Sequence, residues 1–523
     1  MQQKILIALS ALSGLALAAP AGAAPFKCPT TGGNFMFGQA ANVNSLDQMA
    51  SDTISTRNIA MNIYEALMTR SESDQPILQL AQSVARSPDG MTYTFQLRQG
   101  VHFQNGQLMT SKDVVASFNR YAKVGLERGL LTDVQSWDAA APFTFVVHMK
   151  KPEPTFLEQL SSFSAPLVII PASQEHVPAL QLKPIGTGPY ELEQSVPGSY
   201  VKLKRFSGYS PDTRYDNETG LGGYKVACFD TVTFRIVTEP GARVAGLRTG
   251  ELQGVEDVPA KSVPGLEKDK NITIMPLHNW WIQIAEPNTA NAPTDNLWFR
   301  KAVQAGLDMK AIMQAASDGF YRLNVGFQYP SQGADYSDAG KSTYNINNPK
   351  LAKEYLAKAG YHGEPVILLT DHDYPQMYNS AIVMQSQLQA LGINAKLHVT
   401  DWPTSVQIAN TQTSGWNFFF TGWGTEPALG PLAIGEYFGR PAPVYFPPKG
   451  HPDPELVKLW NEMNTVPTAA ERHKVFAKLQ KYALDQVYAL PFGSLTLIQA
   501  VRSDVKGFVP FRIPRMYNVW FQK

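Results

Sequence analysis

Two short stretches of this sequence combine residue types that could bind or transform a small molecule. The first is Thr421-Gly422-Trp423-Gly424-Thr425-Glu426-Pro427, which follows the apolar run 418–420. A strand that ends in a glycine-rich turn predicts a pocket rim, where Glu426 pairs with an ammonium group and aromatic faces stabilise the cation. The second stretch, Asp371-His372-Asp373, follows a predicted strand and could hold a metal ion or a proton. Three such residues in a loop are more often simply solvated.

Further tryptophans gather in the same half of the chain. Trp402 and Trp416 shortly precede Trp423, and the pair Trp280-Trp281 falls on a predicted strand. Tryptophan provides large flat walls for an apolar or cationic ligand. The alternative is that these side chains only fill the core, and the sequence leaves both interpretations open for each of them.

No catalytic pattern accompanies these residues. The sequence contains no zinc-type cysteine cluster, no His-Glu-x-x-His helix and no Gly-x-Ser-x-Gly nucleophile elbow. Gly340-Lys341-Ser342 resembles the end of a phosphate-binding loop, but Asp335 stands where that motif requires its first glycine. We therefore expect a protein that is not an enzyme and that needs neither a cofactor nor a resident metal ion.

The N-terminus has the features of a secretory signal. Lys4 precedes the apolar segment 5–19, and Ala21-Gly22-Ala23 predicts cleavage after Ala23. An uncleaved anchor is the alternative, although the apolar segment is short for a bilayer span. The chain has 45 Lys and Arg against 44 Asp and Glu, and removing residues 1–23 removes only one lysine. This balance argues against nucleic-acid binding and against avid binding to anionic lipid.

The length and the cysteines limit the architecture. With 523 residues, 44% of them hydrophobic, the chain predicts two or three domains. The two cysteines, Cys28 and Cys228, predict one disulfide in an exported protein. Two free buried thiols are the alternative. A disulfide would hold the mature N-terminus beside a segment 200 residues later.

The elements that must position these residues change in character along the chain. Strand alternation predominates at first, and after about residue 280 helices and strands alternate. The unit 366–399 is strand, helix, strand, which implies parallel pairing, and open α/β sheets bind ligands at the carboxyl ends of strands. The predicted strands are 92–97, 143–149, 200–206, 232–237, 366–370 and 393–399, and the predicted helices include one that begins after Thr110, 298–316, 349–360, 381–391 and one that begins after Thr468.

Ordered motifs along nearly the whole mature chain resemble those of one family. They are 62–67 (Asn-Ile-Tyr-Glu-Ala-Leu), 87–95 (Ser-Pro-Asp-Gly-Met-Thr-Tyr-Thr-Phe), Leu97-Arg98-x-Gly100-Val101-x-Phe103, Asn105-Gly106 leading into Ser111-Lys112-Asp113-Val114, Gly186-Thr187-Gly188-Pro189-Tyr190, Phe299-Arg300-Lys301-Ala302 with Leu307-Asp308, and Ala352-Lys353-x-x-Leu356-x-x-Ala359-Gly360. In this order they are similar to the periplasmic peptide/nickel-type solute-binding proteins of ABC importers, the dipeptide- and oligopeptide-binding family.

The resemblance implies an α/β fold of two lobes, with an extra subdomain in the first lobe and a ligand cleft between the lobes. Cys28 and Cys228 would then share the first lobe. The implied parts are the signal peptide 1–23, a first lobe made of 24–57, 187–277 and 491–523, the extra subdomain 58–186, and a second lobe 278–490.

The resemblance also implies binding residues. An aspartate three residues after the Gly-Trp tryptophan holds the ligand's α-ammonium in dipeptide-binding members, and Glu426, with a longer side chain, stands at that position. The stretch 41–46 matches the first-lobe loop that reaches the ligand, and Asp47-Gln48 replaces the family's Asp-Pro. The expected ligand-binding residues are Asn42, Asn44, Trp280, Trp281, Trp402, Trp416, Trp423 and Glu426.

The implied function is carriage of a solute without covalent chemistry. A monomer in the periplasm of a Gram-negative bacterium would capture a small peptide-like or cationic organic solute by lobe closure and deliver it to permease subunits of the inner membrane. The alternatives are an exported peptidase-like hydrolase, which needs a nucleophile or metal set, and a periplasmic chaperone or sensory receptor on the same fold. A nickel or haem carrier would need a cluster of His or Met near the cleft. Peptides, opines, amines and aromatic conjugates all remain candidate solutes.

Overall fold

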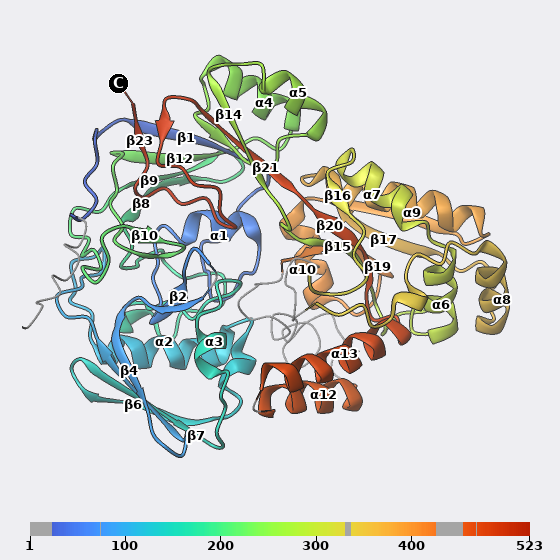
Figure 1. The fold of residues 1–523 in the computed structure, drawn as a ribbon, viewed down its shortest axis with the longest axis horizontal. Coiled ribbons are helices and arrows are strands. Elements are labelled where there is room, and N and C mark those ends of the chain that lie inside the picture. Colours follow the sequence, from blue (N-terminus) through green and yellow to red (C-terminus); the bar gives the residue numbers. More distant parts are fainter. Residues whose placement is uncertain (1–23, 74, 330–335, 425–452, 467, 523) are drawn as a thin grey trace, which may run out of the picture.

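The computed structural model describes residues 24–73, 75–329, 336–424, 453–466 and 468–522. Two large sheets lie side by side along the long axis, and the strands that connect them run through the middle of the molecule (Figure 1). A smaller sheet lies below the first large sheet in this view. Within the described residues, no helix is both long enough and apolar enough to cross a bilayer. The predicted signal 1–23 and Glu426 lie outside the described residues.

The first large sheet combines the beginning, the middle and the end of the chain. Its seven strands follow the order β14-β21-β13-β1-β12-β9-β8. Phe35 and Phe37 on β1 are fully buried, and Phe37 lies opposite Phe234 on the parallel strand β12. The predicted disulfide between Cys28 and Cys228 is present, with Cα atoms 5.6 Å apart. The strands are β1 (Asn34–Gln39), β8 (Tyr190–Val196), β9 (Tyr200–Arg205), β12 (Thr231–Ile236), β13 (Gly254–Val255), β14 (Ile272–Leu277) and β21 (Leu497–Arg502).

A four-stranded antiparallel sheet forms the smaller layer. The predicted alternation is confirmed, because Tyr93, Phe95 and Leu97 are buried on one face while their neighbours are more exposed. Helix α2 begins with the expected capping box between Thr110 and Asp113 and packs on this sheet. The elements are β4 (Ala81–Arg86), β5 (Thr92–Leu97), β6 (Val134–Ala141), β7 (Thr144–Met149), α1 (Ile54–Ala60), α2 (Ser111–Val124), α3 (Phe156–Leu160) and the hairpin β2 (Met68–Arg70) with β3 (Pro76–Leu78).

The second large sheet has six strands in the order β16-β20-β15-β19-β17-β18. The parallel pairing of β17 with β18 across helix α9 confirms the predicted strand–helix–strand unit. The elements are β15 (Ile282–Pro287), β16 (Tyr321–Arg322), β17 (Val366–Asp371), β18 (Ala395–Thr400), β19 (Phe418–Trp423), β20 (Leu490–Leu495), α6 (Leu297–Gly306), α7 (Met309–Ser317), α8 (Pro349–Ala359), α9 (Pro375–Ala390), α10 (Trp402–Thr411), α12 (Pro454–Thr465) and α13 (Ala469–Asp485).

Smaller elements complete the first-lobe side of the molecule. Helix α4 ends at a left-handed Gly250, which lets the chain reverse into the next strand. The remaining described elements include α4 (Pro240–Thr249), α5 (Val263–Leu266), β10 (Glu218–Thr219), β11 (Gly222–Gly223), β22 (Val505–Lys506) and β23 (Trp520–Phe521).

Three local predictions are wrong. The single helix predicted over 298–316 is two helices, because the Asp308 side chain accepts the Ala311 N–H at 3.1 Å and caps a new helix. The helix predicted to begin at residue 381 already begins at Pro375. Trp280 and Trp281 lie on no strand but in the link between β14 and β15, where the chain passes from the first sheet to the second.

Two neighbouring links join the large sheets. One is the segment 278–281, and the other is Thr496, between β20 and β21. The links are tied together, since the Trp280 N–H donates to the Leu495 carbonyl and the Leu495 N–H donates to the Trp281 carbonyl, each at 2.9 Å. Strand β20 belongs to the second sheet, although the boundary expected at residue 491 would have given it to the first lobe.

Candidate functional site

An aromatic cluster lies at the junction of the two sheets. The Tyr374 ring makes edge contacts with Trp281 at 5.9 Å and with Trp402 at 5.6 Å. Trp402 in turn stacks on Phe419 at 5.9 Å, and Trp416 touches the edge of the same Phe419 ring. All five predicted tryptophans belong to this one buried core, which also includes Ala40 and Ala41 of the first lobe.

Indole hydrogen bonds divide the five tryptophans into two groups. The Nε1–H groups of Trp281, Trp416 and Trp423 donate to Gln283, to the Gln412 carbonyl and to Glu286 respectively. Those of Trp280 and Trp402 are buried and find no hydrogen-bond partner among the described residues. A buried polar group without a partner costs free energy, so these two indoles are the better candidates for contact with a bound solute.

The glycine before Trp423 has a packing role. A Cβ atom on Gly422 would lie 2.5 Å from the ring of Trp281. Any larger residue at position 422 would therefore displace that ring from the junction. Gly422 belongs to strand β19 itself and not to the turn predicted after residue 420, and it lets the strand approach the link that carries Trp281.

The first-lobe loop is held in place by a buried ion pair. Asp47 receives two hydrogen bonds from Arg120, at 3.0 and 2.5 Å, and both side chains are buried. Of the two predicted contact residues in this loop, Asn42 is half-buried with an unpartnered Oδ1, whereas Asn44 is exposed. Asn42 Oδ1 is therefore an unpartnered polar atom directly after Ala40 and Ala41, which belong to the core of the second lobe.

The Asp371-His372-Asp373 segment orients other residues. Asp371 accepts the Tyr374 N–H at 2.7 Å, and Asp373 accepts the Trp402 N–H at 2.9 Å. Burial raises the pKa of both aspartates. The described residues contain no group of three His, Cys, Asp or Glu side chains that could hold a metal ion. These carboxyl groups thus place Tyr374 and Trp402 at the carboxyl ends of β17 and β18.

Two acidic residues of the first lobe, Glu256 and Asp257, face this segment. Glu256 accepts the Ala40 N–H at 2.9 Å and the Asn58 side-chain amide at 2.7 Å, and burial raises its pKa to about 7. Asp257 pairs with the buried Arg243 and accepts a hydrogen bond from Gln376 of the second lobe.

Tyr374 lies within this acidic environment, and its hydroxyl has no hydrogen-bond partner in the described part of the chain. Burial raises the pKa of Tyr374 well above its ordinary value, and the carboxyl groups of Glu256, Asp371 and Asp257 raise it further. The hydroxyl is a buried atom without a hydrogen-bond partner. Tyr374 was not predicted from the sequence, although its place directly after a strand end of the parallel unit could have indicated it.

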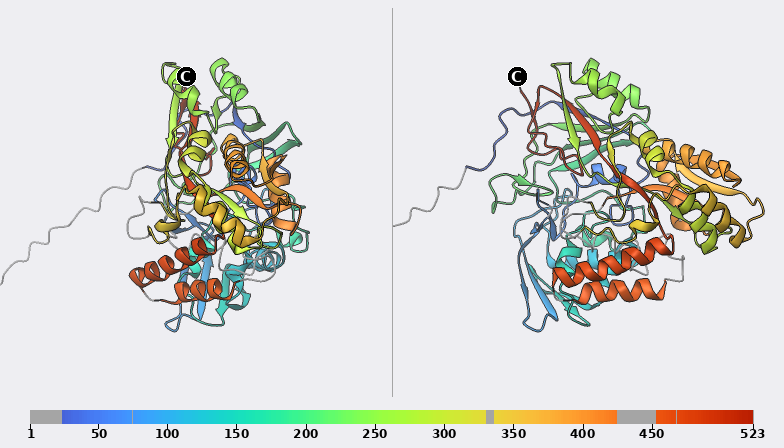
Figure 2. Two further views of the ribbon diagram at one scale, coloured as in Figure 1. Left: turned by 90° about the vertical axis from the view of Figure 1, so that its right-hand side faces the viewer. Right: turned by 45° about the vertical axis from the view of Figure 1, so that its right-hand side comes forward.

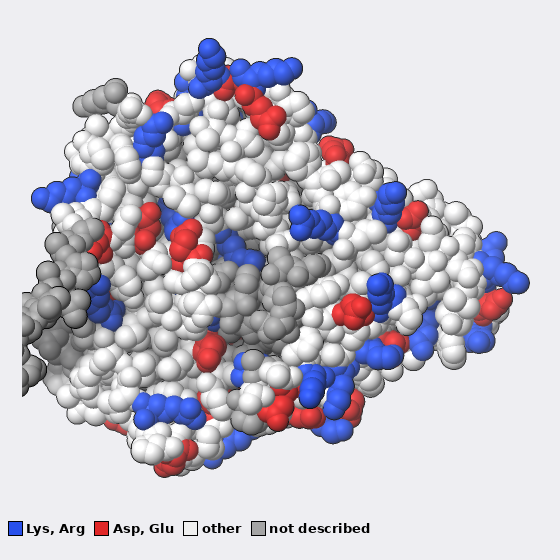
Figure 3. All heavy atoms as spheres, viewed as in Figure 1, with Lys and Arg blue, Asp and Glu red and all other residues white. Residues whose placement is uncertain are grey.

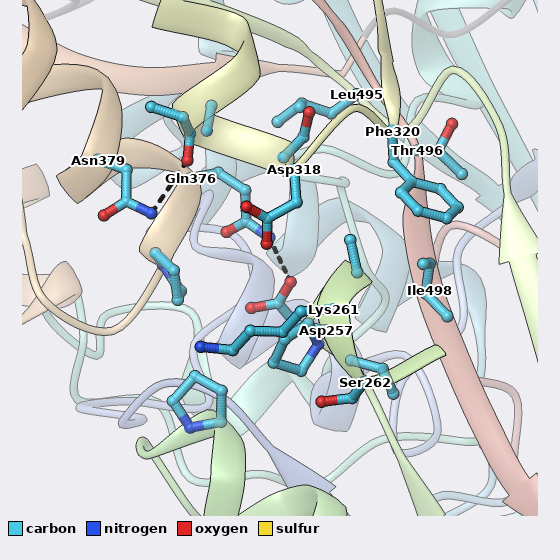
Figure 4. Close-up of a pocket in the computed structure, with 18 of the residues that line it drawn as sticks. Asp257, Lys261, Ser262, Asp318, Phe320, Gln376, Asn379, Leu495, Thr496 and Ile498 are labelled. Carbon is cyan, nitrogen blue, oxygen red and sulfur yellow. Dashed lines mark hydrogen bonds between the residues drawn. The ribbon is translucent and has the colours of Figure 1, made fainter. Parts of the chain in front are cut away.

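A pocket of about 220 Å³ opens beside the Asp257–Gln376 contact (Figure 4). It is lined by both lobes and by Leu495 and Thr496 of one link. Glu239, Asp257 and Lys261 come from the first lobe and Asp318 from the second, so both lobes offer carboxyl groups to this pocket and the first lobe also offers an ammonium group. Because its walls belong to both lobes, its shape depends on how the lobes are oriented.

The face seen in Figure 3 has no large area in which side chains of only one charge sign gather. Lysine and arginine side chains alternate with acidic ones over both lobes. One ion pair of this kind joins Lys202 Nζ and Glu193 Oε2, which are 2.8 Å apart. This face therefore lacks the basic patch that a nucleic-acid footprint requires.

Comparison with known proteins defines the family. Residues 75–441, well over half of the chain, match the model of the bacterial extracellular solute-binding proteins, family 5. The chain belongs to this family. Members of family 5 are binding proteins, and the two-lobed α/β fold with a cleft between its lobes is the one expected from the sequence.

Individual relatives share the full length. A probable peptide ABC transporter periplasmic-binding protein, y4tO of Sinorhizobium fredii, is 26% identical over 91% of this chain and 92% of its own. The glutathione-binding protein GsiB of Escherichia coli K12 is 26% identical, with 95% and 96% covered. The binding protein AgaA of A. tumefaciens R10, solved with agropinic acid, superposes with a TM-score of 0.82 at 24% identity over 94% of this chain and 99% of AgaA.

Proposed function

We propose that this family 5 protein captures a small peptide-like or cationic organic solute between its lobes and delivers it to the permease of an ABC importer. One observation carries the proposal. The Trp402 indole N–H and the Tyr374 hydroxyl are buried without partners in one aromatic cluster at the lobe junction. A solute with polar and apolar groups would satisfy these atoms and bury its surface against the rings.

Lobe closure is the proposed mechanism. A solute that touches both lobes binds the closed form more tightly than the open form and so shifts the population towards closure. We propose a first lobe of 24–57, 187–277 and the chain after Thr496, with the extra subdomain 58–186, and a second lobe that extends to Leu495, because β20 pairs within the second sheet. The permease would then recognise the closed arrangement.

Peptides and peptide conjugates are the solute classes favoured by the relatives. The names of y4tO and GsiB refer to a peptide transporter and to glutathione binding. The proposed binding residues are those predicted from the sequence: Asn42, Asn44, Trp280, Trp281, Trp402, Trp416, Trp423 and Glu426. The unpartnered indole groups give most weight to Trp280 and Trp402.

A thermal-shift screen tests the proposal. The mature protein is heated with dipeptides, glutathione, opines, polyamines and nickel ions, each in separate samples. A solute at a hundredfold over its Kd adds about 2.7 kcal/mol to the free energy of unfolding, which raises the Tm measurably. Stabilisation by at least one solute, abolished in Trp402→Ala, is the expected result. A protein stabilised by no solute, after release of any resident ligand by unfolding and refolding, would contradict the proposal.

The cellular setting is part of the proposal. We propose export to the periplasm of a Gram-negative bacterium, with cleavage after Ala23, and a monomer in solution. N-terminal sequencing of the protein recovered from a periplasmic extract should begin at Ala24. An intact Met1 on the recovered protein would contradict export by cleavage.

A further inference from the structure

A buried glutamate occupies the middle of the second lobe. Glu286, on β15, is fully buried, in a sheet whose other inward side chains are mostly apolar. Its Oε1 accepts a hydrogen bond from Trp423 Nε1, whereas its Oε2 is buried without any partner. A carboxyl group in such a place is costly unless a further group pairs with it.

No lysine or arginine of the described segments neutralises Glu286. Burial raises the pKa of Glu286 well above its ordinary value, the Trp423 hydrogen bond opposes this rise, and the neighbouring Asp52 adds to it. Within the described part of the chain, no lysine or arginine contributes to this balance. Arg57 donates to the Asp52 backbone carbonyl, and its charge lowers the pKa of the Asp52 carboxyl group, so it acts on Asp52. Among the described residues, Glu286 has no positive partner.

Aromatic rings lie on the same side of the sheet as this carboxyl group. Glu286 is directly opposite Phe419 in the antiparallel register of β15 and β19, so both side chains leave the sheet on the same face. The Phe419 ring stacks on Trp402, whose own Nε1–H is unpartnered. Trp423 follows Phe419 on β19 at an even spacing, so its side chain lies on the same face of the sheet. Its Nε1–H donates the hydrogen bond to the Glu286 carboxyl group.

The first lobe approaches the same place. Asp52 precedes α1, and Ile54 at the start of α1 packs against the core that contains Trp402 and Trp423. Burial raises the pKa of Asp52. The lobe junction thus brings a second carboxyl group towards Glu286, and an acidic pair beside aromatic faces is the environment that an ammonium or guanidinium group prefers.

We propose that Glu286 is the carboxylate that binds a positively charged group of the solute, an ammonium or a guanidinium, with Asp52 facing that group from the first lobe. The inference rests on the proposed function and narrows it to solutes that carry a cation. The cation would bridge the two lobes, because its two carboxyl partners come from different ones. Glu426, which the sequence motif suggested for this role, would then be secondary or would bind another group.

Matched variants and matched solutes test this assignment. Glu286→Gln keeps the size of the side chain and an oxygen that can accept the Trp423 hydrogen bond, but it removes the charge. Glu426→Gln is the comparison variant, and circular dichroism and Tm show whether each is folded. The probes are the dipeptide Ala-Phe, its N-acetyl form, glutathione, agmatine and putrescine, with affinities measured by isothermal titration calorimetry.

The expected result is that ammonium- or guanidinium-bearing probes bind the wild type and N-acetyl-Ala-Phe does not. Glu286→Gln should weaken that binding roughly 10- to 100-fold, the value of a charge-assisted contact, and Glu426→Gln should weaken it less. If Glu286→Gln does not fold, Asp52→Asn and the comparison of Ala-Phe with its N-acetyl form still test the charge requirement.

Other outcomes separate the inference from the function on which it rests. Equal binding of Ala-Phe and N-acetyl-Ala-Phe, or full loss in Glu426→Gln with none in Glu286→Gln, overturns the role of Glu286 and leaves solute capture intact. Binding of anionic or neutral solutes alone does the same. A protein that binds none of the solutes in the wider screen contradicts both.

Discussion

One side chain of the second lobe connects it to the extra subdomain, and its removal should open the protein. Asn464 Oδ1, on α12, accepts hydrogen bonds from Thr155 Oγ1 at 3.0 Å and from Gln159 Nε2 at 3.3 Å. Helices α12 and α3 lie side by side in all views, well below the links between the large sheets (Figures 1 and 2). Because the two bonds join the lobes, they exist only when the lobes are closed. Asn464→Ala should therefore shift the equilibrium towards the open form.

The size of the effect follows from the contacts that remain. After Asn464 is truncated, Gln159 Nε2 still donates to Thr155 Oγ1 at 2.9 Å and to Glu153 Oε1 at 2.7 Å, but the buried Thr155 hydroxyl loses the acceptor to which it donates. The loss is then that of a hydrogen bond whose donor stays buried, about 1 to 3 kcal/mol, which corresponds to a factor of roughly 5 to 150 in the closing equilibrium. Where the open form predominates without solute, the apparent Kd should rise by the same factor.

The assay measures the distance between the lobes. Both native cysteines are in a disulfide, so single cysteines introduced at the exposed positions Lys123 and Lys353 can carry spin labels for pulsed electron-resonance distances. Asn461→Ala is the control, since this exposed residue of the same helix makes no side-chain hydrogen bond within the described structure. If Asn464→Ala and Asn461→Ala give the same distance distribution and the same solute affinity, the contact between Asn464 and α3 does not stabilise the closed form.

Three further predictions concern stability and binding. Replacing Cys28 and Cys228 by serine removes a cross-link across 200 residues. The chain-entropy model then predicts that the free energy of unfolding of the first lobe, measured in urea, falls by about 5 kcal/mol. A decrease of less than about 1 kcal/mol would contradict this prediction. The pKa of Glu256, about 7 in the folded protein against an ordinary 4.5, means that its contribution to stability is complete below pH 4.5 and is lost as the pH rises to 7. Between pH 4.5 and 7, the free energy of unfolding should therefore fall by up to about 3 kcal/mol more in the wild type than in Glu256→Gln. Parallel pH profiles of the two proteins would show that the pKa of Glu256 is not raised. Trp402→Phe should keep the ring contacts and leave the Tm nearly unchanged, yet weaken solute binding. Equal affinities of the variant and the wild type in calorimetry would show that the Trp402 indole N–H does not bind the solute.

Local patterns predicted much of the fold because they record burial directly. The alternation of Tyr93, Phe95 and Leu97 predicted strand β5, and the Thr110 capping box predicted the start of α2. The break at Asp308 was missed, because the apolar periodicity continues across it and only the side-chain cap interrupts the backbone. Trp280-Trp281 was assigned to a strand for a similar reason, since a link between two sheets is as apolar as the strands it connects.

The candidate site was predictable only in outline. All five predicted tryptophans lie in the large core of the second lobe, but the sequence could not distinguish Trp416, whose indole is satisfied within its own loop, from Trp402, whose indole is not. Tyr374 and Glu286 were overlooked, because neither belongs to a motif. A glutamate within the run 282–287 was nevertheless a signal, since a charged residue inside a buried strand requires a partner.

By itself, the sequence determined the family, the two-lobed α/β class and the cysteine pair, because these depend on ordered motifs, periodicity and composition. The tertiary structure alone decided which polar atoms at the lobe junction are left without partners. Glu286 meets Trp423 across 137 residues and Gln376 meets Asp257 across 119, so these contacts depend on strand register and on lobe orientation. Such long-range pairing leaves no periodic trace in the chain, since each residue is placed by a different element and only the fold brings them together.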